Sequence, residues 1–432
     1  MKVLNKDEFW SVVNKIVGIG SNALILLVIA KFLPTKDVAV WFLFSAIFGV
    51  VGIIEGGFMQ TLSRHITYIE SGKPSHKNFN INTFIRVNND LFKRIIAYIS
   101  TFALIGGSIY LSINHKIQLS YWDYAAWVVY IINSIIALCA NLYSAILVGF
   151  RQVAITQKFY SITTIINLLM ISVVVIFFKG NNLFGFVISN TFTQLLLLYL
   201  NYKKANTFYE PVIDNKNHCE ERILVKNDMK KMVLNLISYN LLTSIFYILL
   251  SNYVSVKVLA SFGLTVQVIT YIGGIASIML ASNIPFFASL FSQNRIKEMN
   301  RIFFLKAFVA LILFLLGVSS FILFFLYFQK YIPLNTNILT GKILYSFLFY
   351  ITIEYIVSCI SIYLIVCNEL RLMIISLASS IIILILTYIL FRGSHSVTLV
   401  FLSRGCISLF TLYIPIFYFI KNINKNKLLS LL

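Results

Sequence analysis

The chain has 432 residues, of which 59% are hydrophobic and 12% are charged, and its mean hydropathy is +0.87. A soluble domain carries about twice that share of charged residues, so the composition excludes an ordinary soluble enzyme and predicts a protein with several membrane spans. The net charge of +20 resembles that of nucleic-acid-binding proteins. In a membrane protein, however, basic residues gather in cytoplasmic loops, and we expect no nucleic acid as a partner.

The apolar segments are expected to be helices, because lipid cannot satisfy free backbone N–H and C=O groups. Runs such as 24–30 and 379–390 lack the alternation typical of strands. The first apolar segment is too long for the core of a signal peptide, so we expect it to be retained. We predict twelve spans, at about 10–31, 38–62, 95–113, 124–148, 159–178, 184–202, 232–254, 258–281, 307–328, 343–366, 373–391 and 397–420.

The basic residues of the loops predict the orientation of these spans. With the N-terminus placed inside, the inner segments carry 25 of the 35 Lys and Arg residues and the outer loops carry 8. An excess of this size over short loops predicts that both termini lie in the cytoplasm. Two basic residues, Lys15 and Arg404, fall inside spans and are not explained by the rule.

The longest loop, 203–231, divides the predicted spans six and six. We therefore expect an N-terminal six-helix lobe at 1–202, a cytoplasmic linker at 203–231 and a C-terminal six-helix lobe at 232–432. The hydropathy and loop lengths of the two halves correspond at an offset of about 220 residues. Halves that enter from the same side are parallel repeats, and such repeats place a binding site between them. The predicted fold class is thus an all-α integral membrane protein with two lobes, typical of a transporter.

The sequence contains no catalytic signature. A Walker A motif is absent, and the five cysteines and five histidines have no metal-ligand spacing. The outer loops are short, which leaves no external domain for an active site. We expect no enzyme activity, no catalytic or metal-binding residues and no cofactor.

Ionisable residues inside the spans are candidates for function, because each costs about 2.5–3.5 kcal/mol to insert. Lys15 lies near the inner end of the first span, and either extends to the interface or faces a cavity. Arg404 lies about 10 Å from the outer end of the last span and needs a partner or a cavity, as an anion ligand or by extending outward. Glu354 lies near the midplane, either as a neutral structural carboxyl or as a proton-coupling group.

Uncharged polar side chains form further faces on the predicted spans. We expect Asn22, Asn141, Asn190, Gln194 and Gln267 to contact a substrate in the cavity, although hydrogen bonding between helices explains any single one. Ser45, Gly49, Gly52 and Gly56 form a stripe of small residues beside Glu55, which is expected to permit close helix packing.

Two segments resemble motifs of a known family. The stretch GIIEGGFMQTLSR at 52–64 and the run LVGFR at 147–151 are similar to the loops after the second and fourth spans of Wzx-type polysaccharide flippases. These proteins belong to the multidrug/oligosaccharidyl-lipid/polysaccharide (MOP) superfamily, which also contains the MATE transporters. The usual acid of the first motif is Asp, and this chain has Glu55. Together with the twelve spans, the resemblance covers the whole chain.

The resemblance implies a substrate and a mechanism. The substrate would be an undecaprenyl-pyrophosphate-linked oligosaccharide, moved from the inner to the outer leaflet of the bacterial cytoplasmic membrane by alternating access, for O-antigen, capsule or exopolysaccharide synthesis. Lys15 and Arg404 would hold the pyrophosphate. The candidates for coupling or gating are Glu354, Glu55, Arg64, Arg151 and Arg371.

The expected partners are the lipid-linked oligosaccharide, membrane lipids, and the polymerase and chain-length regulator of the same pathway. Three alternatives remain open. A MATE-like drug or cation antiporter would prefer acidic cavity residues, and a lipid II flippase usually has fourteen spans. A polysaccharide polymerase usually has a long external loop, which this chain lacks.

Overall fold

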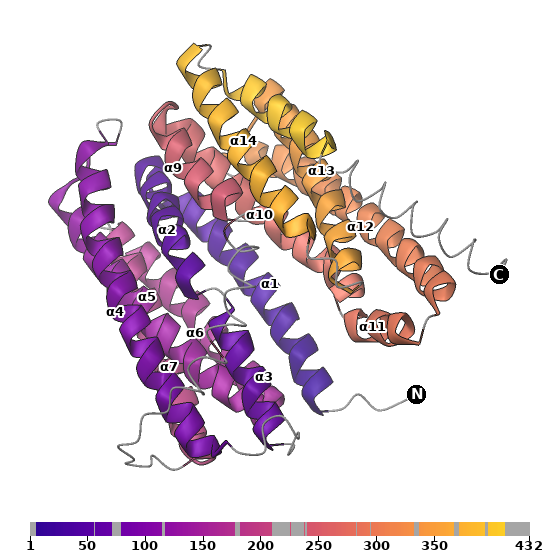
Figure 1. Cartoon of the computed structure of the whole chain (residues 1–432). Helices are drawn as coiled ribbons and strands as arrows, with labels where there is room; N and C mark the ends of the chain where they lie inside the picture. Colours follow the sequence, from indigo (N-terminus) through magenta and orange to yellow (C-terminus); the bar gives the residue numbers. More distant parts are fainter. Residues whose placement is uncertain are drawn as a thin grey trace. The chain divides into compact units, whose positions relative to one another are not determined.

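The computed structural model describes residues 6–55, 57–70, 79–114, 117–177, 182–209, 225, 237, 240–281, 283–293, 295–331, 337–366, 371–393 and 396–410 (Figure 1). These residues form helices and turns and contain no strand. They divide into two compact units, Met1–Asn252 and Tyr253–Leu432. The all-helical class that the sequence predicts is therefore confirmed for the described part of the chain.

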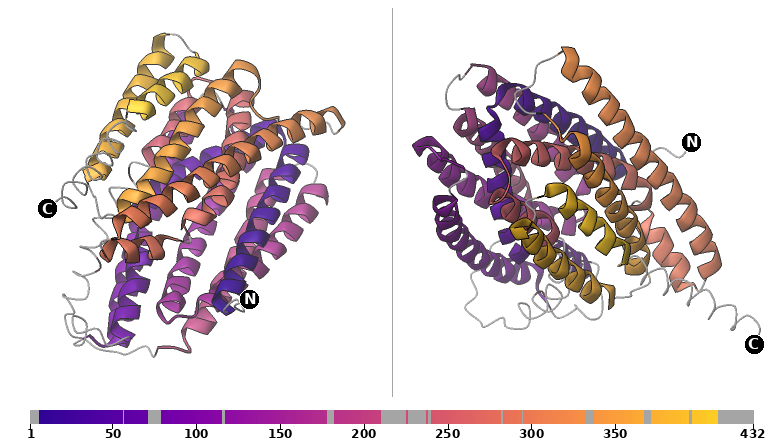
Figure 2. Two further views of the ribbon diagram at one scale, coloured as in Figure 1. Left: turned by 90° about the vertical axis from the view of Figure 1, so that its right-hand side faces the viewer. Right: turned by 90° about the horizontal axis from the view of Figure 1, so that it is seen from above.

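The described residues of the first unit form nine helices in chain order. They are α1 (Lys6–Phe32), α2 (Thr35–Glu55), α3 (Phe58–Glu70), α4 (Ile81–Ile113), α5 (Tyr121–Gly149), α6 (Val153–Phe177), α7 (Asn182–Ala205), the short π-helix η2 (Leu241–Ile245) and α9 (Phe246–Ser251). Helix α5 is central, since it packs against α2, α3, α4, α6 and α7, and α1 packs chiefly against α6. Helices α5, α6 and α7 pack against one another and α4 packs against α5, within the purple helices of Figure 2.

The second unit contains α10 (Val256–Ala281), α11 (Ile284–Ser292), α12 (Ile296–Tyr331), α13 (Gly341–Val366), α14 (Arg371–Gly393) and a last helix, Val397–Phe410. Helices α10, α11 and α13 all pack against α12. The rings of Phe314 and Tyr355 stack with their centroids 4.1 Å apart, and the Tyr363 hydroxyl donates to Asn300 Oδ1 at 2.8 Å. Both contacts join α12 to α13.

Local sequence sets the helix ends. The Asn80 side chain accepts hydrogen bonds from the first turn of α4, and Ser120 with Asp123 forms a capping box at the start of α5. Helix α2 ends at Glu55, and α3 begins after Gly57, whose φ of +76° is favourable only for glycine. The expected continuous span 38–62 is therefore wrong in its second half, because this backbone turn separates α2 from α3.

Eight helices are long and apolar enough to cross a membrane, within the part of the chain that the structure describes. They are Phe9–Phe32, Ile81–Ile113, Tyr121–Gly149, Val153–Val175, Leu183–Ala205, Val256–Ile278, Ile296–Phe325 and Gly341–Tyr363. Each corresponds to one of the predicted spans. The shorter apolar helices Leu241–Ser251, Leu377–Gly393 and Val397–Phe410 fall in three others. Twelve crossings and the sides of the termini stay predictions.

The helix bounds follow the predicted offset. Helices α2, α5 and α6 begin at Thr35, Tyr121 and Val153, and α10, α13 and α14 begin about 220 residues later. The boundary between the compact units falls after Asn252, so η2 and α9 pack within the first unit. There Gly49 of α2 approaches Ser244 so closely that a Cβ at position 49 would overlap the serine hydroxyl. This contact confirms close packing at one residue of the small-residue stripe, while the division into functional six-helix lobes stays a prediction.

Candidate functional site

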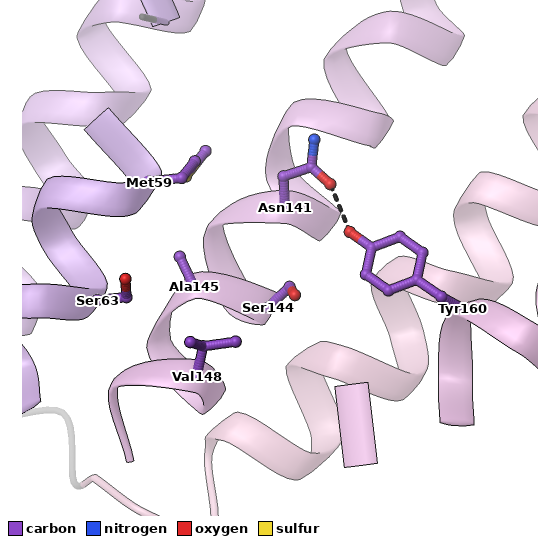
Figure 3. A pocket seen from close by; sticks show the side chains of 7 residues that line it. All are labelled: Met59, Ser63, Asn141, Ser144, Ala145, Val148 and Tyr160. Atoms are coloured by element: carbon purple, nitrogen blue, oxygen red, sulfur yellow. Dashed lines mark hydrogen bonds between the residues drawn. The ribbon is translucent and has the colours of Figure 1, made fainter. Parts of the chain in front are cut away.

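A cavity of about 330 Å³ lies within the first unit, between α3, α5 and α6 (Figure 3). Its lining comprises Met59 and Ser63 from α3, Asn141, Ser144, Ala145 and Val148 from α5, and Tyr160 from α6. None of these seven side chains is charged. The cavity therefore offers hydroxyl and amide groups beside apolar surface, which suits a neutral polar ligand.

A hydrogen bond fixes the polar wall of this cavity. The Tyr160 hydroxyl donates to Asn141 Oδ1 at 2.6 Å, and the Asn141 amide nitrogen points away from the tyrosine (Figure 3). Asn141 was predicted from sequence as a substrate contact, and it does line a cavity. Its partner Tyr160 was missed, because a single sequence shows which residues share a helix face but not which residue of another helix they meet.

Hydrogen bonds and close packing hold α3 against α5 beside the cavity. The Thr67 hydroxyl lies 2.9 Å from the Gly149 carbonyl and 3.0 Å from the Ser63 carbonyl, which ties α3 to the last turn of α5. A Cβ at Gly149 would lie 2.7 Å from Ile66 Cβ, closer than side-chain contacts allow. Glycine at 149 thus permits α3 to pack directly on α5 and close one side of the cavity.

A chain of uncharged polar groups joins α1 to α6. The Asn14 side chain hydrogen-bonds Gln157 Oε1, and the Ser161 hydroxyl donates to Asn14 Oδ1 at 3.3 Å. At the same end of the two helices, Asp7 Oδ1 accepts from the Ala154 N–H at 2.9 Å, so α1 caps the start of α6. Asn14 lies in the predicted span 10–31, where the candidates predicted from sequence are Lys15 and Asn22, and Gln157 precedes the predicted span 159–178.

Lys15 and Asn22 lie on α1, and the structure places neither of them in the cavity. Lys15 is exposed and Asn22 is half-buried. A Cβ built at Gly18 or Gly20 would meet nothing within 4 Å, so open space adjoins this stretch of helix within the described residues. Lys15 is therefore free to meet an anion from outside the unit, without leaving a packed position.

Two of the remaining predicted amides contact their own helices. Asn190 Nδ2 donates to the Phe186 carbonyl at 3.2 Å, and Gln267 Nε2 donates to the Tyr271 hydroxyl at 2.7 Å. Gln194 is half-buried on α7. Asn190 and Gln194 do not line the cavity with Asn141, and Gln267 belongs to the second unit.

Two polar pairs join α13 to the helix Val397–Phe410 in the second unit. Arg404 is only 2% exposed, and its Nη2 donates to the Tyr350 hydroxyl at 2.5 Å, with Cζ 4.2 Å from the ring centroid. One turn further along both helices, the Ser408 hydroxyl donates to Glu354 Oε1. The partner that the sequence predicts for Arg404 is thus a tyrosine, and a cation–π contact accompanies the hydrogen bond.

Arg151 occupies a special backbone position at the end of α5. Its φ is +57°, its N–H donates to the Val148 carbonyl at 2.9 Å, and the Gln152 N–H donates to the Leu147 carbonyl at 2.9 Å. This pattern is a Schellman motif, in which glycine is the usual residue at the Arg151 position. The Arg151 side chain is exposed and lies 3.8 Å from Glu70 of α3.

The other candidates for coupling or gating are only partly described. Arg64 is half-buried on α3. Glu55 is the last residue of α2 and Arg371 the first of α14, and both side chains lie outside the described part of the structure. No group of three His, Cys, Asp or Glu side chains in the described ranges is arranged to hold a metal ion.

An ionic cluster where α2 meets α5 was not predicted. Lys36 Nζ lies 2.8 Å from Asp123 Oδ2, which also accepts from the Ser120 hydroxyl at 2.9 Å. Burial, reinforced by the charge of Asp123, raises the pKa of Asp37 to about 6, although Lys36 and the Leu183 N–H oppose the shift. The sequence shows these charges at predicted span ends, where they resemble ordinary interfacial residues.

Comparison with known proteins gives matches in structure only. No protein-family model matches the chain, and no curated protein sequence does. An inward-facing multidrug resistance MATE family transporter of the MOP superfamily matches with a TM-score of 0.76 and 12% identity, over 95% of each chain. The lipid II flippase MurJ in an inward closed conformation matches with a TM-score of 0.64 and 13% identity, over 95% of this chain and 87% of that one.

A third structure shows that proteins with this fold differ in their pockets. It is a MOP superfamily transporter from Pyrococcus furiosus, described as having a binding pocket of reversed polarity that suggests a different function. It matches with a TM-score of 0.62 and 14% identity, over 96% of this chain and 94% of that one. At these identities the likeness establishes architecture, not substrate. The chain therefore has, over nearly its whole length, the fold of MOP-superfamily transporters.

Proposed function

We propose that this chain is a flippase that moves an undecaprenyl-pyrophosphate-linked oligosaccharide repeat unit to the outer leaflet of a bacterial cytoplasmic membrane, for O-antigen, capsule or exopolysaccharide synthesis. Two six-helix lobes would alternate access to the substrate, with both termini in the cytoplasm. The fold supports a transporter or flippase, since its structural matches include multidrug transporters and a lipid II flippase.

One observation carries the choice of substrate. Between α1, α5 and α6 of the first unit, the described hydrogen bonds from side chain to side chain join amides and hydroxyls, as in the Asn14–Gln157–Ser161 chain and the Tyr160–Asn141 pair. Of the acidic side chains described in this unit, Asp7, Asp37 and Asp123 lie in the first turns of their helices, and Glu70 ends α3. Asp90 lies on α4 before the predicted span 95–113, with its Oδ1 3.7 Å from Lys93 Nζ. Amides and hydroxyls hydrogen-bond sugars, whereas a cation would need carboxylates to offset its desolvation.

The two unexplained basic residues differ in what they offer a pyrophosphate. Lys15 is exposed, so we assign it the contact with the charged group. Arg404 is buried against Tyr350, and it reaches an anion only in a state in which the Tyr350 ring has moved aside. Glu354, which accepts from Ser408, is our candidate for coupling to a proton. The polymerase and chain-length regulator of the pathway are the proposed protein partners.

The test is translocation in proteoliposomes. A fluorescent undecaprenyl-pyrophosphate-linked oligosaccharide is placed in both leaflets, and the fraction open to a membrane-impermeant glycosidase is followed over time. The expected result is accelerated exchange between leaflets, slowed by Lys15→Ala and little changed by Lys31→Ala at the other end of the same helix. Full activity of both Lys15→Ala and Arg404→Ala would refute the cationic contact. Absence of translocation by the unmodified protein would refute the function.

A second candidate function is a MATE-like drug or cation antiporter, which the first structural match favours. It predicts proton- or sodium-driven efflux of ethidium from the same proteoliposomes. A lipid II flippase is the third, and it predicts translocation of lipid II in place of the oligosaccharide lipid.

A further inference from the structure

The cavity between α3, α5 and α6 contains two polar groups with no internal partner. Ser144 is 9% exposed and has no hydrogen-bond partner among the described residues, and neither does the amide nitrogen of Asn141. Neither Ser144 Oγ nor Asn141 Nδ2 is fully buried, so both donors are open to a ligand that enters the cavity.

The free hydroxyl of Ser144 has a specific structural cause. Serines inside helices usually donate to the carbonyl four residues earlier, as Ser134 and Ser161 do here. For Ser144 that carbonyl belongs to Ala140, and it also accepts from Asn201 Nδ2 at 3.2 Å. Together with the helical N–H bond, Asn201 uses both lone pairs of this oxygen, so the Ser144 hydroxyl is left for the cavity.

The Asn141 amide is held in one orientation by a similar device. Because Tyr160 donates to Oδ1, the NH₂ group is turned away from the tyrosine and keeps its hydrogens for another acceptor (Figure 3). Ser144 and Asn141 are three residues apart on α5 and line the same cavity. Beside them lie the apolar surfaces of Met59, Ala145 and Val148.

We propose that this cavity binds a single neutral sugar ring, with Ser144 and Asn141 as hydrogen-bond donors. A sugar presents hydroxyl oxygens on its rim and C–H groups on its faces, which matches donors placed beside apolar surface. A volume of about 330 Å³ is at the lower end of ligand pockets and fits one ring rather than a chain. Phosphate is disfavoured, because no lining side chain is basic.

This inference rests on the proposed function, because it assigns this cavity to one sugar of the proposed substrate. The cavity lies at the α5 end that leads into the segment 150–152, which the charge pattern places on the cytoplasmic side. A sugar bound there would be the part of the substrate first engaged from the cytoplasm. The site stays separate from the pyrophosphate contact assigned to Lys15, which lies on a different helix.

Binding of free sugars tests the site directly. Saturation-transfer NMR on the full chain in nanodiscs would use methyl α-glucoside, methyl N-acetylglucosaminide and methyl fucoside as probes, with glucuronate and tetraphenylphosphonium as charged controls. The expected result is saturable binding of at least one neutral glycoside and none of the charged probes. Ser144→Ala should weaken binding by about two- to tenfold, the value of one hydrogen bond, and Asn141→Leu by a similar factor.

Matched variants separate binding from folding. Ser134→Ala on the same helix removes a hydroxyl that is already bonded to the Tyr130 carbonyl, and it should leave glycoside affinity unchanged. Tyr160→Phe keeps the ring but releases the Asn141 amide, so it should weaken binding less than Asn141→Leu.

The proposed site would be refuted if no neutral glycoside showed saturable binding. It would also be refuted if glycoside affinity were equal in the variants Ser144→Ala, Asn141→Leu and Ser134→Ala. If the protein translocates lipid-linked oligosaccharide but binds no free glycoside, the site fails and the function stands. If it binds glycosides but transports only cations, the function fails and the site stands.

Discussion

Tyr350→Phe tests how Arg404 is accommodated inside an apolar helix. The substitution keeps the ring, and with it the cation–π contact at 4.2 Å, but removes the oxygen that accepts from the guanidinium. A hydrogen bond to a charged group contributes about 1.5–3 kcal/mol. Neutral hydrogen bonds between membrane helices average about 0.6 kcal/mol. Because Arg404 stays charged and 2% exposed, we expect Tyr350→Phe to lower the free energy of unfolding by about 1.5–3 kcal/mol.

The double-mutant cycle isolates this contact. Arg404→Leu removes the charge, and in that background Tyr350→Phe should lower the free energy of unfolding by less than about 0.5 kcal/mol, which gives a coupling energy of about 1.5–3 kcal/mol. The measurement is equilibrium unfolding in mixed micelles by titration with sodium dodecyl sulfate, followed by circular dichroism. Tyr345→Phe on the same helix is the control, because Tyr345 is 72% exposed. A coupling energy below about 0.5 kcal/mol would refute the contact.

Three further predictions concern the first unit. Gly149→Ala should lower the free energy of unfolding by about 1–3 kcal/mol, because the added Cβ overlaps Ile66. Gly18→Ala is the control, because a Cβ there meets nothing within 4 Å. Equal thermal midpoints for the two variants would contradict the packing of α3 on α5. Arg151→Gly should leave the free energy of unfolding unchanged or raise it by about 1 kcal/mol. Glycine removes the strain of a left-handed backbone at this position, and only an exposed ion pair is lost. A clear loss of stability would contradict the left-handed backbone. The raised pKa of Asp37, about 6 against an ordinary 3.8, means that the folded state binds the proton more tightly than the unfolded chain, so stability falls as the pH rises from about 4 to above 6. Asp37→Asn should flatten that fall in thermal midpoint, and an unchanged slope would contradict the shift.

The sequence predicted those features that depend on neighbours along the chain. Hydropathy located the long helices, and the offset between halves anticipated that α5 and α13 begin about 220 residues apart. The break between α2 and α3 was missed because an apolar window runs through Gly57, although the glycine itself marks the turn. The free-energy cost of placing a charged side chain in the membrane indicated that Arg404 needs a partner, because this cost depends only on the chemistry of arginine.

Features that depend on another helix were beyond a single sequence. Asn141 was recognised as polar on a helix face, but its pairing with Tyr160 and the free hydroxyl of Ser144 depend on how α5, α6 and α7 pack. The same holds for Gln157, whose bond to Asn14 joins helices that are far apart in the chain. Helix periodicity specifies a direction around one axis, and only tertiary structure supplies the partner in that direction.

The most direct test of the proposed function is a comparison of substrates in one preparation of proteoliposomes. Leaflet exchange of undecaprenyl-pyrophosphate-linked oligosaccharide is measured beside ethidium efflux under the same proton and sodium gradients. Our account predicts protein-dependent exchange of the oligosaccharide lipid, reduced by Lys15→Ala, and no protein-dependent ethidium efflux. Ethidium efflux without exchange of the oligosaccharide lipid would contradict it and would make the chain a cation antiporter.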